Sequence, residues 1–185
     1  MILLCHGRTE AVRRAACSAD EPLDEQGRRG AARLTGSIPD AEDVVTAPSL
    51  CCRQTAELAG LSPRVDLSLA APDYGSWTGR TVDDVEQSAL TAWLADPTSA
   101  PHGGESLADV LARIGAWLDG LPPRRSVLAI ADAAVIRSAL VHAVAGRPES
   151  VWRFDVTPLS MAVLVGEPGR WNLRTLGLND PVSRN

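Results

Sequence analysis

The sequence contains no lysine, one tyrosine and one phenylalanine, and it lacks a long hydrophobic run. A membrane-spanning helix needs about 18 to 20 predominantly apolar residues in succession, and no stretch of the chain approaches that length. The acidic residues number 23 against 18 basic ones, which gives a formal net charge of −5. This balance argues against a nucleic-acid partner and against binding to an anionic membrane. The lack of lysine reads as a habit of composition with no functional meaning.

The opening apolar run, residues 1–4, is too short for a signal peptide, and no basic segment precedes it. We therefore expect a cytoplasmic location. The four cysteines, Cys5, Cys17, Cys51 and Cys52, are then expected to be reduced thiols or metal ligands rather than disulfide partners.

A length of 185 residues with 45% apolar content suits one globular domain with a sizeable core. No internal repeat, linker or low-complexity segment divides the chain, so we predict a single domain over residues 1–185. Oligomeric state is left open, and a homodimer is compatible with the sequence.

The hydrophobic pattern alternates short strands with helices. Strands are predicted at residues 2–5, 43–46 and 126–131, with a closing hairpin at 160–165 and 171–176. Helices are predicted at 23–36, 48–60, 106–121 and 134–146, with one or two short helices between 82 and 94, whereas residues 62–80 look irregular. This order predicts an α/β fold, a three-layer α/β/α sandwich around a mostly parallel sheet.

Pockets in such sheets form beyond the carboxyl ends of the strands. Cys5-His6-Gly7 ends the first strand, and Ala131-Asp132-Ala133 ends the strand at 126–131. These two segments are therefore the first candidates for a functional site.

Six segments, taken in order, resemble the motifs of the histidine phosphatase (phosphoglycerate-mutase-like) superfamily. They are the strand end at 4–9 (Leu-Cys-His-Gly-Arg-Thr), the Pro-Leu-Asp segment at 22–29, the helix at 47–57, the Asp-Tyr-Gly-Ser-Trp loop at 73–79, the Gly-Gly-Glu-Ser turn at 103–106 and the strand-to-helix turn at 130–137. Each motif alone is weak, but their shared order covers nearly the whole chain.

The resemblance implies a family mechanism in which one His accepts the phosphoryl group, two Arg and a second His bind it, and a carboxylate donates a proton. Here the acceptor is kept as His6. Cys5 and Cys51 stand at the two Arg positions, Ala71 stands at the proton-donor position and Asp132 stands at the second His. Because developing negative charge on phosphate needs fixed cations around it, these replacements predict little phosphatase activity. Arg8, at the family's usual Glu position, is the basic residue best placed to rebuild a phosphate site.

The resemblance further implies that Cys5, His6, Cys51 and Asp132 converge on one small volume. Two thiols, an imidazole and a carboxylate form a ligand set suited to zinc, which can activate a bound water. The spacing itself carries no metal signal, and small buried cysteines are the alternative. Asp132 has its own alternative role as the cap of the next helix.

Other residues are candidates for the walls of the pocket. Tyr74 and Trp77 are expected to be a pocket wall or a packing anchor, and His102 lies on a turn that borders the pocket in the family. Glu105 is expected at that border too, where it caps or braces the helix from Ser106.

Three functions follow. The first is a repurposed enzyme that acts on a small molecule by hydrolysis, hydration or elimination, using zinc with His6, Asp132 and Arg8. The second is a non-catalytic relative that binds a ligand or partner. The third is a residual phosphohydrolase in which His6 accepts the phosphoryl group beside Arg8.

Overall fold

The computed structural model describes residues 1–178, and its centre is one six-stranded sheet in the order β3-β2-β4-β1-β5-β6. The strands are β1 (Ile2–Cys5), β2 (Asp43–Thr46), β3 (Arg64–Val65), β4 (Val127–Ala131), β5 (Ser160–Glu167) and β6 (Arg170–Leu178). The pairs β1–β4, β2–β4 and β2–β3 are parallel, whereas β5 runs antiparallel to both β1 and β6. The predicted α/β fold with a mostly parallel sheet and a closing hairpin is confirmed.

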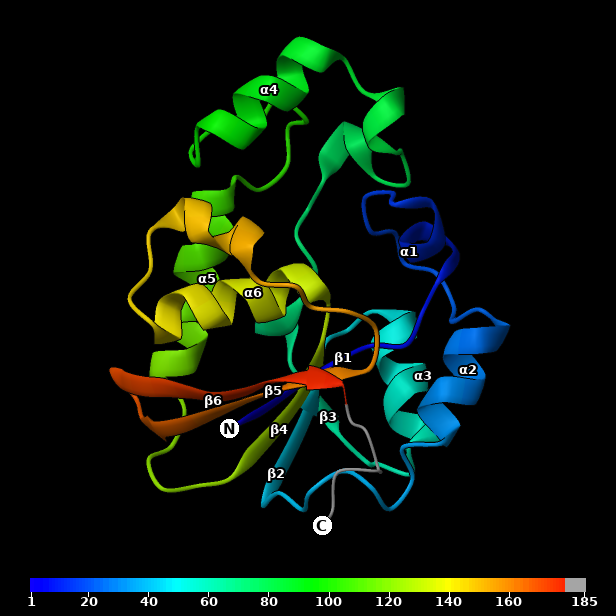
Figure 1. Cartoon of the computed structure of the whole chain (residues 1–185), viewed down its shortest axis with the longest axis vertical. Coiled ribbons are helices and arrows are strands. Elements are labelled where there is room, and N and C mark those ends of the chain that lie inside the picture. The colour runs from blue at the N-terminus through cyan, green and yellow to red at the C-terminus, as the bar shows by residue number, and fades with distance from the viewer. Residues whose placement is uncertain (179–185) are drawn as a thin grey trace.

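Helices cover both faces of this sheet (Figure 1). The pair α2 (Glu25–Ala32) and α3 (Leu50–Leu58) covers one face, and the pair α5 (Leu107–Asp119) and α6 (Ala133–Ala143) covers the other. The central strand β4 has all five residues buried between these layers, as its continuous apolar run predicts. Within residues 1–178, no helix is both long enough and apolar enough to span a membrane.

A smaller group of elements lies beyond the helices, away from the sheet. Figure 1 shows α4 (Gln87–Ala95) and the 3₁₀ turn at Val82–Asp84 above the ends of α5 and α6. These are the one or two short helices expected between residues 82 and 94. Trp93 of α4 packs edge to face with two tryptophans of other segments, and its ring centroid lies 5.9 Å from that of Trp77 and 5.1 Å from that of Trp152.

The structure adds elements that periodicity did not indicate. They are α1 (Glu10–Arg14), strand β3 and three further 3₁₀ turns at Leu67–Leu69, Gly75–Trp77 and Pro148–Arg153. All are six residues or shorter, too short for a helical or strand period to show in the sequence. The predicted helix at 23–36 is also shorter than expected, because α2 ends at Ala32 and the chain continues in turns.

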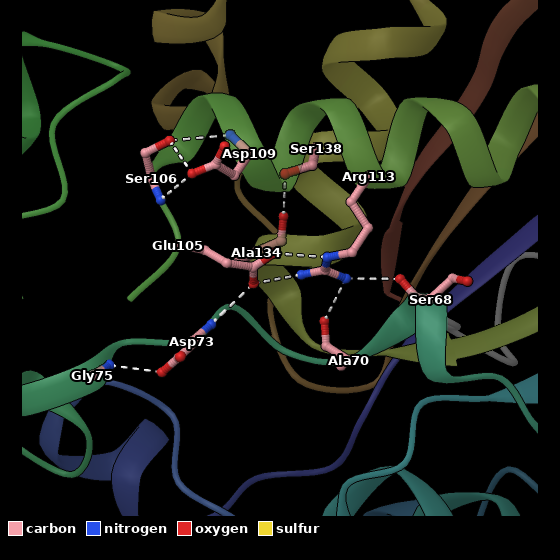
Figure 2. Close-up of polar contacts among 10 residues, drawn as sticks. All are labelled: Ser68, Ala70, Asp73, Gly75, Glu105, Ser106, Asp109, Arg113, Ala134 and Ser138. Atoms are coloured by element: carbon pink, nitrogen blue, oxygen red, sulfur yellow. Dashed lines mark hydrogen bonds and ion pairs between the residues drawn. The ribbon is translucent and has the colours of Figure 1, made fainter. Parts of the chain in front are cut away.

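Arg113 of α5 anchors the segment that runs from the sheet towards the small group of elements (Figure 2). Its guanidinium donates to both carboxylate oxygens of Glu105 at 2.8 Å, and also to the carbonyl oxygens of Ser68 at 2.7 Å and Ala70 at 3.0 Å. Glu105 in turn accepts a hydrogen bond from the Asp73 N–H at 3.1 Å. The predicted bracing role of Glu105 is therefore confirmed, and its partner is Arg113.

Candidate functional site

His6 and Asp132 lie side by side because the two strands that carry them are neighbours. Cys5 of β1 is in register with Ala131 of β4, and the His6 N–H donates to the Ala131 carbonyl at 3.1 Å. The next residue on each strand therefore leaves the sheet at the same carboxyl edge. The His6 Nε2 atom lies 3.6 Å from Asp132 Oδ2, and both side chains are nearly buried, with 5% and 11% exposed.

Helix α3 brings Cys51 to the same edge. The Thr55 hydroxyl accepts a hydrogen bond from the Gly7 N–H at 2.9 Å and donates to the Cys51 carbonyl at 2.7 Å. One buried side chain thus ties the turn after β1 to the first turn of α3. Gly27 allows the neighbouring α2 to approach that turn closely, since a Cβ atom there would lie 2.1 Å from the Arg8 carbonyl oxygen.

These residues line a small cavity of about 30 Å³, called here the His6 cavity. Its polar lining is His6, Thr9, Ser18, Glu21, Ser49, Cys51 and Asp132, and the rest is alanine and Val12. Ala71, at the expected proton-donor position, is among those alanines. A wider hollow of about 270 Å³ adjoins it and shares Ser18, Ala19, Ser49 and Ala71. Among the described residues, no arginine contributes to the lining of the His6 cavity.

His6 and Asp132 form a buried ion pair. Burial alone would lower the pKa of His6, but its interactions with Asp132 and Cys51 raise that pKa well above the usual value of 6.5. Burial alone would raise the pKa of the Asp132 carboxyl, yet hydrogen bonding to His6 and to the Ser18 hydroxyl holds it below its usual range. Asp132 and Cys51 thus favour the protonated form of the imidazole. Its Nδ1–H donates to the Gly7 carbonyl at 2.7 Å, and Nε2 is the nitrogen that faces Asp132.

Asp132 also performs the simpler role that the sequence suggested. It is the N-cap of α6, and its Oδ1 accepts from the Ala134 N–H at 2.7 Å. Its Oδ2 accepts from the Ser18 hydroxyl at 2.7 Å. Helix capping and the contact with His6 thus use different oxygens of one carboxylate.

The three cysteines near this edge differ in how their surroundings shift the pKa of the thiol. Burial raises the pKa of the Cys5 thiol to about 12. The pKa of the Cys51 thiol is lowered to about 5. The largest cause is the adjacent Cys52 thiol, and the His6 imidazole adds to it, while burial acts in the opposite direction. The pKa of Cys52 is raised well above its usual value by Cys51 and by burial. Among these three thiols, Cys51 is thus the one whose ionised form is favoured, and it is the one that lines the cavity.

The expected zinc set of Cys5, His6, Cys51 and Asp132 gains no support from this geometry. Within residues 1–178, no group of three or more His, Cys, Asp or Glu side chains is arranged to hold a metal ion. The reason is visible in the individual residues. Cys5 is buried within the core and only 2% exposed, and both carboxylate oxygens of Asp132 already accept hydrogen bonds.

Arg8 lies outside the lining of the His6 cavity. Its Nε donates to Asp24 Oδ2 at 2.6 Å, and Asp24 is the N-cap of α2. The side chain is 34% exposed. Arg8 therefore serves the start of α2 in this structure, although the sequence suggested a place for it at the phosphate site.

The remaining expected binding residues border a second cavity of about 60 Å³, called here the aromatic cavity. Its lining includes Tyr74, Trp93, Glu105, Arg137 and Trp152. The rings of Trp77 and His102 pack edge to face at 5.1 Å beside it, as a packing anchor rather than a wall of the His6 cavity. The Nδ1 atom of His102 accepts from the Gly104 N–H at 3.0 Å. The structure thus places Tyr74, Trp77, His102 and Glu105 together but away from the His6 cavity lining.

Sequence reasoning missed Ser18, Glu21 and Ser49 as parts of the site. Ser18 bonds Asp132, and the Ser49 hydroxyl lies 3.5 Å from the Cys51 sulfur. Ser49 carried a usable signal, because a serine directly before a helical run is a typical N-cap. Ser18 and Glu21 lie in an irregular stretch with no periodic pattern, and only the fold brings them to the cavity.

Comparison with known proteins finds one family over almost the entire chain. The profile of the histidine phosphatase superfamily (branch 1) matches residues 1–179. Glucosyl-3-phosphoglycerate phosphatase of Mycobacterium tuberculosis is 33% identical over 124 residues, which is 61% of this chain. The matched segment spans 56% of the length of that curated relative.

Solved structures agree on the architecture. Mycobacterial glucosyl-3-phosphoglycerate phosphatase in complex with VO3 superposes with a TM-score of 0.78 at 27% identity, covering 96% of this chain and 98% of that one. A phosphoserine phosphatase mutant of Entamoeba histolytica in complex with phosphoserine gives a TM-score of 0.86, covering 98% of each chain. At 16% identity the second likeness concerns the fold alone.

Proposed function

The chain belongs to the histidine phosphatase superfamily (branch 1), and from that premise we propose that its His6 cavity no longer performs the family's phosphoryl transfer. The cavity instead acts on a small molecule by non-phosphoryl chemistry. The observation that carries this proposal is the lining of the His6 cavity, to which no described arginine contributes while Asp132, Glu21 and the Cys51 thiol do.

The charge of the lining argues against a phosphate ester as ligand. A phosphoryl group carries up to two negative charges, and binding it in a closed site needs opposing cations, of which arginine is the best suited. The His6 imidazolium is already neutralised by Asp132 at 3.6 Å. A dianion entering the cavity would therefore meet like charges at Asp132 and Cys51, which disfavours its binding.

The protonation of His6 argues against its role as phosphoryl acceptor. A histidine attacks phosphorus through the lone pair of a neutral ring nitrogen. In this structure Nδ1–H is bonded to the Gly7 carbonyl, and the Asp132 carboxylate stabilises the proton on Nε2. The protonated form, which Asp132 favours, has no lone pair on either nitrogen. The same imidazolium is well placed to donate a proton, which suits hydrolysis or elimination.

The proposal implies a small, uncharged or cationic ligand, and no nucleic-acid or membrane partner. It also fits the cytoplasm, where a reduced thiol at Cys51 persists. Zinc is not part of the proposal, because the ligand set it requires is not assembled within the described residues.

A phosphatase assay tests the proposal directly. Wild-type protein and the His6→Ala variant are compared on p-nitrophenyl phosphate and on glucosyl-3-phosphoglycerate, the substrate named for the mycobacterial relative. We expect both proteins to give the same rate, at the level of the buffer. Turnover by the wild type that His6→Ala abolishes would overturn the proposal and favour the residual phosphohydrolase. Assaying the same preparation after metal analysis shows whether any activity follows bound zinc.

A further inference from the structure

The Cys51 thiol occupies the second position of a nine-residue helix. Helix α3 begins at Leu50, with Ser49 as its N-cap. Thiols at helix N-termini are stabilised as thiolates by the positive end of the helix dipole. His6 lines the same cavity and interacts with Cys51, and a histidine beside a cysteine is the pairing that activates thiols for attack.

The first turn of α3 also has backbone donors left for a ligand. The Ser49 side chain makes no capping hydrogen bond, and the Leu50 N–H donates to Asp20 at 2.7 Å. Within residues 1–178, the N–H groups of Cys51 and Cys52 have no protein acceptor. Free N–H groups at a helix start bind developing oxyanions. A nucleophile and an oxyanion site therefore coincide at one end of α3.

Access to the thiol runs through the wider hollow. Cys51 is only 5% exposed, so large reagents are excluded. The hollow of about 270 Å³ shares Ser18 and Ser49 with the His6 cavity and opens to solvent. A small substrate group can therefore reach the sulfur from this side. Cys17, by contrast, is more exposed but does not line the His6 cavity.

We propose that Cys51 is a catalytic nucleophile for small uncharged carboxylic esters, with His6 as the proton donor and acceptor. The inference rests on the proposed function, since it names the chemistry of the same cavity. The negative charges of Asp132 and Glu21 favour an uncharged acyl group over an anionic one. Asp132 acts as a positioning residue that keeps His6 protonated before each turnover.

The reaction balances with water as the only co-substrate. The Cys51 thiolate attacks the carbonyl carbon, a C–S bond forms and the C–O bond to the leaving group breaks. The leaving alkoxide takes the proton of His6 Nε2 and departs as an alcohol. Neutral His6 then takes a proton from water, and the resulting hydroxide attacks the thioester. The carboxylic acid leaves, and the Cys51 thiolate and His6 imidazolium are restored.

Ester turnover with p-nitrophenyl acetate, an uncharged probe, tests the inference. We expect Cys51→Ala to lower the rate above buffer at least ~100-fold, well within the loss that removing a nucleophile causes in other hydrolases. His6→Ala should lower it about 100-fold through loss of acid–base catalysis. Cys17→Ser is the matched control and should retain the wild-type rate. Acid-quenched protein should carry an acetyl group on the peptide that contains Cys51.

A second measurement needs no variant. Wild-type protein is treated with a limiting amount of iodoacetamide at pH 6.5, and the labelled peptides are identified by mass spectrometry. We expect Cys51 to be alkylated before the more exposed Cys17. Labelling of Cys17 first, acetylation at another residue, or an unchanged ester rate in Cys51→Ala would each overturn the inference. None of these three results concerns phosphate esters, so each would overturn the inference about Cys51 and leave the proposed function unaffected. Phosphatase activity that depends on His6 would instead refute the proposed function itself.

Discussion

Replacing Asp132 with Asn isolates the charge of the buried ion pair. Asn is as good an N-cap as Asp, so the Oδ1 contact with the Ala134 N–H is kept. The Ser18 hydroxyl can still bond the amide that replaces Oδ2. What disappears is the negative charge 3.6 Å from His6 Nε2. At that separation the attraction is about 5 kcal/mol for an effective dielectric constant of about 20.

Part of that attraction only offsets the cost of burying the two charges, so the net loss on substitution is smaller. Breaking a buried pair leaves an uncompensated charge and costs roughly 3 kcal/mol, and His6 can limit the cost by releasing its proton. We therefore expect Asp132→Asn to lower the free energy of unfolding by about 3 kcal/mol at pH 5.5. The pKa of His6 should fall, because its largest favourable partner is gone.

The stability lost in Asp132→Asn should depend on pH, in a direction that the pKa shifts of His6 and Asp132 determine. The folded pKa of His6 is raised, so its contribution is fully present below the ordinary value of 6.5 and is lost as the pH rises through the folded pKa. The folded pKa of Asp132 is lowered, so its contribution is present above the ordinary value of 3.8 and is lost as the pH falls through the folded pKa. The difference in the free energy of unfolding between wild type and Asp132→Asn is thus largest between pH 3.8 and pH 6.5, and it becomes smaller at alkaline pH.

Urea unfolding of both proteins across pH 5 to 10, with an NMR titration of His6, measures these effects. Asp24→Asn is the matched control, because Asp24 caps α2 and pairs with Arg8, whose charge is constant over this range. The difference in the free energy of unfolding between Asp24→Asn and the wild type should not vary with pH over this range. A difference for Asp132→Asn that is equally flat from pH 5 to 10 would refute the ion pair.

Three further predictions concern the scaffold and the site. Gly27→Ala should lower the free energy of unfolding in urea by more than about 3 kcal/mol, because the added Cβ meets the Arg8 carbonyl oxygen at 2.1 Å. The control is Gly30→Ala on the same helix, whose added Cβ meets only the movable end of the Leu159 side chain. It should lower the free energy of unfolding by less. Arg113→Met should cost about 2 to 4 kcal/mol in the same assay, whereas Arg29→Met, which breaks the exposed pair with Glu25, should cost no more than about 0.5 kcal/mol. The double variant Cys51→Arg, Asp132→His should hydrolyse p-nitrophenyl phosphate at least about tenfold faster than the wild type. If this variant melts like the wild type and shows no such gain, the absence of an arginine from the His6 cavity is not what prevents phosphatase activity.

The sequence predicted the layers of this fold because its buried elements are long and strongly patterned. The run at 126–131 could only be an interior strand, and the stripe of α5 could only face the core. It also identified the two strand ends that meet at the site, since parallel neighbours end at one edge. The strand ends therefore predicted His6 and Asp132, whereas Cys51 was predicted from the resemblance to the family.

What the sequence could not supply was the partner of each polar side chain. Arg8 lies two residues beyond His6, yet it turns to the N-cap of α2 instead of the cavity. Tyr74 and His102 belong to a loop and a turn whose position is set by Arg113, a contact over more than 30 residues of chain. The choice between metal ligation and a protonated core thiol at Cys5 depends on burial, which spacing does not encode.

The contact of Thr55 with Gly7 and with the Cys51 carbonyl has a consequence for how such a site can change. It joins strand and helix through main-chain atoms, so the side chains of Cys5 and Cys51 are not needed to hold the turn and the helix together. Each of them can be exchanged while its Cα atom stays where it is. Reactive side chains of a different kind can therefore replace these two cysteines while the strand and the helix keep their relative positions.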